Sequence, residues 1–386
     1  MSVAANNSQN GEEETYQEAA IEKMLDNLPV LRQLFNVHFK IGEGTFSNVY
    51  LATMKSSKES KKFAIKHLIP TYPENRIARE LQCLQEIGGA DNVVGIEFCV
   101  RNEGSVAFVM PYMRHTKFTD YFYNMDNLEL KNYMRALMIA LRKVHLFNVL
   151  HRDVKPSNFL YDRRNRKYLL VDFGLAQNCN DTKALVTKQQ VDDHRQRKKT
   201  DENNRKLSTE SLNKSENLNT CNCFGKPSVC SICTVKPSQV ASRAGTPGYR
   251  APEVLFKYIH QTSAIDIWAS GIIMLCIMSA TLPFFRCPDD CTALAEITTV
   301  FGTTKMTQCA RKLGKKFITS ETLPGIDLKT LCQKLRSRSK SPQNDKTPLE
   351  ENYSTEAYDL LTRLLDVDFK TRITADEALN HPFLKV

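Results

Sequence analysis

Apolar residues recur at helical spacing in three parts of the chain. Within Tyr16–Phe35 they stand at positions 21, 24, 25, 28, 31, 34 and 35, which places them along one face of a helix. Pro29 lacks a backbone N–H and predicts a break into a helix and a shorter lead-in. Arg76–Ile87 and residues 128–146 predict two further amphipathic helices.

Short apolar runs between polar residues predict buried strands. One run, Phe63–Ile65, ends in the single lysine Lys66, and others cover Val106–Met110 and Leu169–Val171. Ahead of them, Ile41–Tyr50 contains two glycines in a Gly-x-Gly pattern and predicts a hairpin whose backbone other groups can approach closely.

Three stretches are rich in polar residues and poor in core-forming ones. Residues 1–14 and 180–220 are expected to be disordered, and residues 336–352 are expected to form an exposed insertion. Within the second stretch, the basic run Arg195–Lys199 fits either a nuclear-import signal or a solvated surface.

One apolar run approaches the length of a membrane span. Ile267–Phe285 contains 19 residues without a charge. Small and polar residues interrupt it and no basic cluster flanks it closely, which favours a buried helix over a membrane span. The interrupting residues are Ser270, Gly271, Ser279, Thr281 and Pro283.

Composition indicates a globular protein with a positive surface. The 386 residues are 41% apolar, and 53 Lys and Arg against 43 Asp and Glu give a net charge of +10. This charge favours acidic partners, either acidic protein segments or nucleic acid, although surplus surface lysine would give the same sum. Residues 1–20 lack the apolar core of a signal peptide, which predicts a reducing, intracellular location and thiols rather than disulfides.

Four of the twelve cysteines lie within thirteen residues: Cys221, Cys223, Cys230 and Cys233. Two close pairs joined by a short loop can supply four thiolates to one tetrahedral Zn²⁺ ion. The first pair is spaced CxC rather than the commoner CxxC, so unligated thiols remain the alternative. The pattern predicts a structural zinc site.

The sharpest chemical signal is the run His151–Asn158 (HRDVKPSN), which is followed by a DFG tripeptide that starts at Asp172. Asp153 is suited to accept the proton of an attacking hydroxyl. Asn158 and Asp172 offer the oxygen ligands that Mg²⁺ prefers. Lys155 can stabilise a phosphoryl group in transfer, so the set predicts a phosphoryl-transfer centre.

A nucleotide site is predicted beside this centre. The hairpin backbone at Gly42 and Gly44 can approach phosphates, and Lys66 can pair with the α- and β-phosphates. Such a lysine needs a carboxylate to hold it. Glu80 lies beside the apolar face of its helix and is the first candidate, with Glu86 as the alternative. A plain surface role for Glu80 also remains open.

These motifs, together with the stretch Gly245–Arg250 (GTPGYR), resemble the eukaryotic Ser/Thr protein kinases. The resemblance implies an α+β, two-lobed protein kinase fold with insertions, in which a small β-rich N-lobe precedes a large, mostly helical C-lobe. The implied parts are a tail and lead-in helix (1–35), the N-lobe and hinge (36–113), and the C-lobe (114–386), interrupted at 180–243 and 336–352.

The resemblance also implies roles for single residues. The hinge would bind adenine through its backbone, Glu253 would pair with Arg372, and Asp266 would bond the backbone of the catalytic loop. The catalytic residues would be Asp153, Lys155, Lys66 and Glu80, and the Mg²⁺ ligands Asn158 and Asp172. The ATP site would be lined by Ile41, Gly42, Gly44, Val49, Ala64, Lys66, Met110, Pro111, Tyr112 and Met113.

The segment from Asp172 to Glu253 spans 82 residues, far more than a kinase activation segment needs. Four features narrow the resemblance to the cell-division-cycle-seven group of kinases. They are the length of this segment, the cysteine cluster, the Gly-Glu-Gly-Thr-Phe-Ser hairpin and the Ala176-Gln177 pair. That group implies ATP, Mg²⁺ and structural Zn²⁺ as cofactors, a nuclear location and a Dbf-type activator subunit. It also implies a role in DNA replication and cell-cycle progression, through acid-flanked sites on the replicative minichromosome maintenance helicase.

Two other classes of protein stay open. A pseudokinase scaffold would keep the fold without the chemistry, but the intact set of Lys66, Asp153, Asn158 and Asp172 argues against it. A zinc-containing nucleic-acid binder would use the basic charge, but no basic helix lies beside the cysteines. The function that the resemblance implies requires no direct binding of this protein to nucleic acid and no contact with a membrane. We expect activity to need a bound partner, because ordering a long activation segment costs on the order of 1 kcal/mol per residue.

Overall fold

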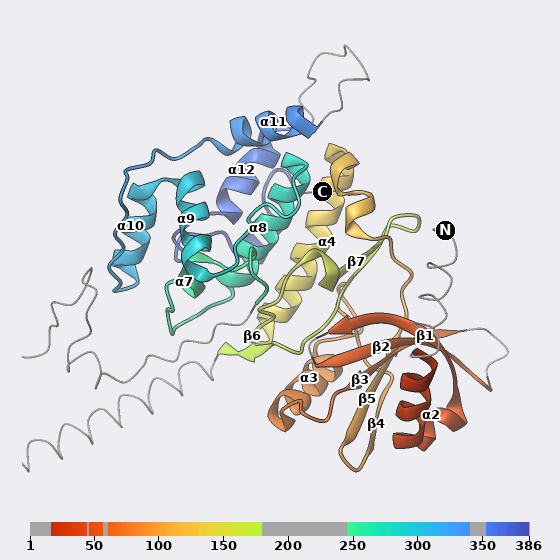
Figure 1. The fold of residues 1–386 in the computed structure, drawn as a ribbon. Coiled ribbons are helices and arrows are strands. Elements are labelled where there is room, and N and C mark those ends of the chain that lie inside the picture. Colours follow the sequence, from red (N-terminus) through yellow and green to blue (C-terminus); the bar gives the residue numbers. More distant parts are fainter. Residues whose placement is uncertain (1–16, 45, 57–60, 180–244, 340–352, 386) are drawn as a thin grey trace, which may run out of the picture.

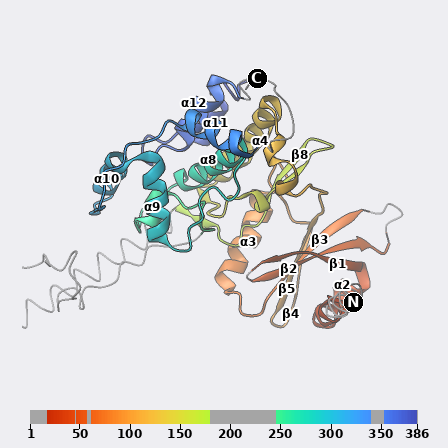
Figure 2. The ribbon, with the colours of Figure 1, turned by 45° about the horizontal axis from the view of Figure 1, so that its top comes forward.

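The computed structural model describes residues 17–44, 46–56, 61–179, 245–339 and 353–385 (Figure 1). They form a β-sheet lobe and a larger helical lobe, and the chain passes from the first to the second after strand β5 (Ser105–Pro111) (Figures 1 and 2). The predicted α+β, two-lobed fold is confirmed.

The smaller lobe is an antiparallel sheet in the order β1-β2-β3-β5-β4. Alternation along β3 directs Phe63 and Ile65 to one face, where they join the core formed with α2 (Figure 1), and Lys66 and Leu68 to the other, toward α3. The predicted hairpin and both predicted strands of this lobe are confirmed. The elements are α2 (Pro29–Leu34), β1 (Phe35–Gly44), β2 (Ser47–Met54), β3 (Lys62–Leu68), α3 (Glu74–Glu86), β4 (Phe98–Asn102) and β5.

The predicted break in the first helical stretch is also confirmed. Residues 17–27 are helical, Leu28 leaves the helix, and Pro29 opens α2 at its first turn. The missing N–H of proline costs little there, because the first N–H groups of a helix have no partner within it. Met24, Leu28 and Leu31 are buried against the sheet, so this stretch is part of the core of the small lobe.

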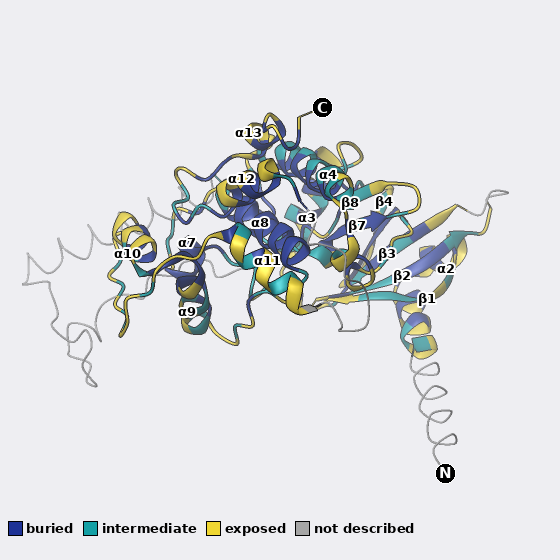
Figure 3. Cartoon of the chain, turned by 90° about the horizontal axis from the view of Figure 1, so that it is seen from above, coloured by how far each residue is buried: buried dark blue, intermediate teal, exposed yellow. Residues whose placement is uncertain are grey.

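The larger lobe is built around α8 (Ala264–Ser279), in which Ile265–Ser279 are all buried (Figure 3). At Gly271 a Cβ atom would stand 2.7 Å from Leu365, so close packing requires glycine there. The first thirteen residues of the uncharged run, Ile267–Ser279, therefore belong to a buried core helix, as predicted, and the run leaves the helix after Ser279. Among the residues described, no helix has the length and apolar character to cross a membrane.

Other helices pack around α8 or against its neighbours (Figures 1 and 3). The helix predicted over residues 128–146 is α4, which begins one residue earlier. These helices are η1 (Phe118–Asp120), η2 (Phe122–Asn124), α4 (Asn127–Leu146), α7 (Pro252–Leu255), α9 (Asp290–Phe301), α10 (Thr303–Lys312), α11 (Leu328–Ser339), α12 (Thr355–Leu364) and α13 (Ala375–Leu379).

Two short antiparallel strand pairs bracket the motif residues. Strand β6 (Val149–Leu150) pairs with β9 (Gln177–Asn178), and β7 (Phe159–Asp162) pairs with β8 (Lys167–Leu170). The HRDVKPSN run lies between β6 and β7, and one residue, Val171, separates β8 from the DFG tripeptide. The two motifs are therefore delivered to one place, as the sequence predicts.

The predicted boundary of the second insertion at residue 336 falls inside helix α11. Arg336 donates to the carbonyl oxygen of Met278 near the end of α8 (3.0 Å) and to the hydroxyl of Tyr353 (2.9 Å). The last carbonyl groups of a helix need donors from outside it, which explains why this basic residue belongs to the packed lobe. Residues 340–352 lie outside the described part of the chain, as do the stretches 1–14 and 180–220.

Candidate active site

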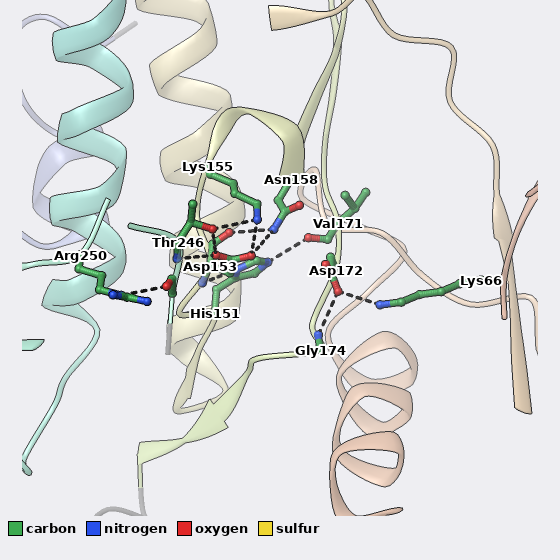
Figure 4. A network of polar contacts seen from close by, with 11 residues as sticks. Lys66, His151, Asp153, Lys155, Asn158, Val171, Asp172, Gly174, Thr246 and Arg250 are labelled. Carbon is green, nitrogen blue, oxygen red and sulfur yellow. Dashed lines mark hydrogen bonds and ion pairs between the residues drawn. The ribbon is translucent and has the colours of Figure 1, made fainter. Parts of the chain in front are cut away.

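Strand β3 and helix α3 bring Lys66 and Glu80 together as an ion pair. The Lys66 ammonium contacts the Glu80 carboxylate and lies 2.7 Å from Oδ1 of Asp172, a contact drawn in Figure 4. The side chains of Lys66 and Glu80 are 8% and 1% exposed, whereas that of Asp172 is 44% exposed. The alternative carboxylate, Glu86, lies at the end of α3 and accepts a hydrogen bond from Gln82 instead.

The charges of this cluster do not balance. Burial alone would lower the pKa of Lys66, but the carboxylates of Asp172 and Glu80 raise it above its ordinary value, so the ammonium stays charged. Burial alone would raise the pKa of Asp172, but Lys66 and the Gly174 N–H lower it to about 2. Among the described residues, one cation thus faces two carboxylates, and the surplus negative charge lies at the exposed residue Asp172.

Asp153 is held by donors from both sides (Figure 4). The side-chain amide of Asn158 donates to its carbonyl oxygen (2.9 Å) and to Oδ2 (3.0 Å), and Lys155 Nζ lies 2.9 Å from Oδ2. From the other side, Thr246 donates to Oδ1 through its hydroxyl (2.7 Å) and its backbone N–H (3.0 Å). The carboxylate is therefore fixed in one orientation.

Helix α8 anchors the loop that carries Asp153. The Asp266 carboxylate accepts hydrogen bonds from the backbone N–H groups of His151 (2.9 Å) and Arg152 (2.8 Å), and Nε2 of His145 lies 3.0 Å away. Burial alone would raise the pKa of Asp266, but these partners lower it below the ordinary value. The predicted contact between Asp266 and the catalytic loop is confirmed.

A cleft of about 690 Å³ opens beside these groups, a size that suits a nucleotide. A Cβ at Gly42 would stand 3.6 Å from Val49, which is ordinary contact, so packing within the chain does not demand glycine there. A ligand that approaches the backbone closely would leave no room for a Cβ atom and would explain the glycine. All residues predicted to line the ATP site border the cleft: Ile41, Gly42, Gly44, Val49, Ala64, Lys66, Met110, Pro111, Tyr112 and Met113.

ATP with Mg²⁺ fits the groups that face this cleft. Asn158 and Asp172 both border it, and the amide oxygen of Asn158 takes no part in the bonds to Asp153. These two oxygens would hold the ion, and it would neutralise charge on the phosphates as well as the surplus charge of the cluster. Lys66 would face the phosphates, and the backbone after β5 would face the adenine.

One residue of the site was not predicted. Thr246 donates to Asp153 and accepts a hydrogen bond from Lys155 Nζ (2.9 Å), although the sequence marked only the stretch that contains it. Gly245 has φ of +106°, and a Cβ there would meet the carbonyl oxygen of Arg152 at 2.8 Å. A hydroxyl residue between a glycine and a proline is the signal that could have identified it.

The cysteines predicted to bind zinc, Cys221, Cys223, Cys230 and Cys233, lie outside the described residues. Within the described ranges, no group of three or more His, Cys, Asp or Glu side chains is arranged to hold a metal ion. A Mg²⁺ ion that arrives with a nucleotide needs fewer protein ligands, because phosphate and water complete its coordination.

Comparison with known proteins agrees with this geometry. Residues 35–195 and 230–384 match the protein kinase domain. The chain is 34% identical to the "Cell division cycle 7-related protein kinase" of Mus musculus, over 95% of this chain and 93% of that protein. It is 34% identical to the "non-specific serine/threonine protein kinase Cdc7" of Drosophila melanogaster, over 95% and 76%. It is 31% identical to the "Cell cycle serine/threonine-protein kinase hsk1" of Schizosaccharomyces pombe, over 94% and 75%. The chain belongs to the protein kinase family and, within it, to the Cdc7 serine/threonine kinases.

Proposed function

We propose that this kinase transfers the γ-phosphate of ATP to serine and threonine residues in acidic stretches of nuclear proteins, and that its substrates include the replicative minichromosome maintenance helicase. The observation that carries the chemistry is that Lys66, Lys155, Asn158 and Asp172 border one cleft. Asp153 lies directly behind them, in contact with Lys155 and Asn158. The net charge of +10 supports the preference for acidic substrates.

Each polar group has a separate role in the proposed transfer. Asp153 accepts the proton of the attacking hydroxyl, and Lys155, which lies beside it, stabilises the phosphoryl group. Asn158 and Asp172 would hold Mg²⁺, which would neutralise charge on the phosphates. Lys66, oriented by Glu80, pairs with the α- and β-phosphates, so that catalysis rests on positioning and charge stabilisation.

A role in starting DNA replication, and so in cell-cycle progression, follows from the proposed substrate. The names of two relatives, which contain "cell division cycle" and "cell cycle", support a function in division. The basic run Arg195–Lys199 supports nuclear import.

The substrate proposal is tested by radiolabel transfer from ATP to two serine peptides. One carries acidic residues on both sides of the serine, and the other carries their amides. We expect kcat/KM to be at least about tenfold higher for the acidic peptide, because several charged contacts are lost in the amide version. Equal rates would reject acidic specificity, and no transfer to either peptide or to the helicase subunits would reject the function.

We also propose that Cys221, Cys223, Cys230 and Cys233 bind one structural Zn²⁺ ion. Four thiolates close a tetrahedral site and leave no position for chemistry. Elemental analysis of the full chain is expected to give one zinc per molecule, and a Cys230→Ser, Cys233→Ser variant is expected to lose it. Zinc that persists undiminished in that variant would refute this ligand set.

A Dbf-type activator subunit is the proposed partner. It would dock on the cysteine-bearing insertion and on the small lobe near α3, and it would favour the arrangement in which Glu80 contacts Lys66. The transfer rate of the isolated chain is expected to lie well below that of the co-purified complex at equal concentration. Equal rates, or an isolated chain whose activity is unchanged by deletion of residues 181–240, would end this proposal.

A further inference from the structure

Tyr72 lies in the turn between β3 and α3 and touches two parts of the active site. Its side chain is buried, with the residue 5% exposed. The hydroxyl donates to the carbonyl oxygen of Gly174 (2.8 Å), and Oε2 of Glu80 lies 3.4 Å away. One side chain thus contacts both the carboxylate that holds Lys66 and the tripeptide that presents Asp172.

The other side of Tyr72 contacts the tip of the glycine-rich hairpin. Its ring lies against that of Phe46, with ring centroids 5.5 Å apart. The backbone continues this connection, because Ile69 N–H donates to the Phe46 carbonyl (2.9 Å) and Tyr72 N–H donates to the Ile69 carbonyl (2.9 Å). The turn Ile69–Tyr72 therefore joins the hairpin, helix α3 and the segment after β8.

The fit around the hydroxyl is tight. A Cβ at Gly174 would stand 3.0 Å from the Tyr72 oxygen and 3.1 Å from Oδ1 of Asp172, so a side chain there would displace one or the other. Burial raises the pKa of Tyr72, and the Glu80 carboxylate raises it further. The hydroxyl consequently keeps its proton and acts as a donor.

We propose that Tyr72 is a positioning residue for phosphoryl transfer. It fixes three parts of the site relative to one another: the hairpin tip, Glu80 and the segment from Asp172 to Gly174. In this arrangement Lys66 lies between its two carboxylates. Tyr72 does not border the cleft, so it acts through other residues. The contacts of its hydroxyl require α3 and the Gly174 segment to be in place together, so they favour that arrangement over others. The inference rests on the proposed function of the cleft.

The test is Tyr72→Phe, which keeps the ring against Phe46 and removes only the hydroxyl. We expect kcat to fall about three- to tenfold, the scale of one buried hydrogen bond, and KM for ATP to change less than about twofold because the cleft lining is intact. The matched control is Tyr353→Phe in the other lobe, where the hydroxyl of a buried tyrosine donates to the Met125 carbonyl (2.9 Å). That variant should lose stability but keep kcat per folded molecule.

A double-mutant cycle with Glu80→Gln separates positioning from simple packing. If Tyr72 acts through the Lys66 arrangement, the effect of Tyr72→Phe on kcat should shrink to less than about twofold in the Glu80→Gln background. Fully additive effects, an unchanged kcat in Tyr72→Phe, or an equal loss in Tyr353→Phe would each overturn the proposal. If Tyr72→Phe does not fold, Phe46→Leu replaces it in the same cycle, because it removes the ring contact on the other side of Tyr72. A loss of kcat that shrinks in the Glu80→Gln background would support the proposal, and a fully additive loss would overturn it.

Failure of the proposed function would look different. In that case the unmodified chain, assayed with its activator, would transfer no phosphate. An active unmodified chain with an unaffected Tyr72→Phe variant would reject only the role of Tyr72.

Discussion

Two ionic clusters differ in their charge balance: one lies inside the helical lobe, and the other lies at the cleft and joins residues of both lobes. In the helical lobe, Arg372 holds the Glu253 carboxylate through two hydrogen bonds (2.7 and 3.0 Å), with the side chains 0% and 1% exposed. Arg372 also donates to the carbonyl oxygens of Ala264 (2.7 Å) and Asp366 (2.8 Å). The predicted pair is confirmed, and each charge has its counterpart within the chain.

In the part of the chain that the structure describes, the cluster at the cleft has one cation for two carboxylates. Lys66 faces both Glu80 and Asp172, and Asp172 remains 44% exposed. The comparison teaches that burial of an ion pair does not by itself mark a functional site, because the fully balanced pair lies in the core of the fold. The cluster with surplus charge, open to a cleft, is the one prepared for a cation and phosphates.

The largest effect on stability is expected for Glu253→Gln. It keeps the shape but leaves the guanidinium of Arg372 buried without a counter-charge, so the free energy of unfolding should fall by about 3–5 kcal/mol. The kcat per folded molecule should stay within about twofold of the unmodified value. Denaturant unfolding and steady-state transfer measure both quantities.

Glu97→Gln is the matched control for that variant, because the pair of Lys61 and Glu97 is exposed. It should change the free energy of unfolding by less than about 1 kcal/mol. If Glu253→Gln lowered the free energy of unfolding as little as Glu97→Gln, the pair of Arg372 and Glu253 would not be important for stability, and the comparison of the two clusters would fail.

A smaller, pH-dependent effect is expected for Asp266→Asn, since Asp266 links the helical core to the cleft. At neutral pH the variant should lose about 2–3 kcal/mol, the scale of hydrogen bonds to a charged group. The pKa of Asp266 lies below its ordinary 3.8 in the folded state, so its contribution is present above that pH and is lost as the pH falls below it. Unfolding measured across this range should show a shrinking difference between the two proteins. A difference that stays constant would contradict the lowered pKa.

A stability effect smaller than that of Glu253→Gln or Asp266→Asn is expected for Glu80→Gln. Lys66 keeps Asp172 as a partner in this variant, so the free energy of unfolding should fall by only about 1 kcal/mol. Its kcat should nevertheless fall about tenfold, because Lys66 loses its orienting carboxylate. Thermal unfolding and transfer assays, run side by side with Glu253→Gln, should give opposite rankings. If the same variant lost more in both stability and kcat, the two clusters would not differ in function as described.

Much of the site could be predicted because its signals are local. The run from His151 to Asn158 and the DFG tripeptide are each a contiguous motif, and the helical period of α3 makes Glu80 the first candidate to hold Lys66. The burial of α8 could be predicted in the same way, from the absence of charge between Ile267 and Phe285.

The rest depends on contacts between distant parts of the chain. Thr246 meets Asp153 across 93 positions, and Tyr72 meets Gly174 across 102, so neither contact leaves a periodic pattern. The polar neighbours of Arg336 predict an exposed insertion, whereas its partner Met278 lies 58 positions away in the sequence. Long polar side chains can cap a helix as easily as they can face solvent, and composition does not distinguish the two.

The most direct test of the account is the turnover of Asp172→Asn. This change removes the exposed negative charge of the cleft cluster while it keeps the shape of the side chain. We predict that kcat for transfer to a serine substrate, measured with Mg²⁺ and saturating ATP in the complex with activator, falls at least about 100-fold. The free energy of unfolding should change by less than about 1 kcal/mol, because much of the side chain is exposed. An Asp172→Asn protein that turns over near the unmodified rate would contradict the claim that the unbalanced cluster is the centre of phosphoryl transfer.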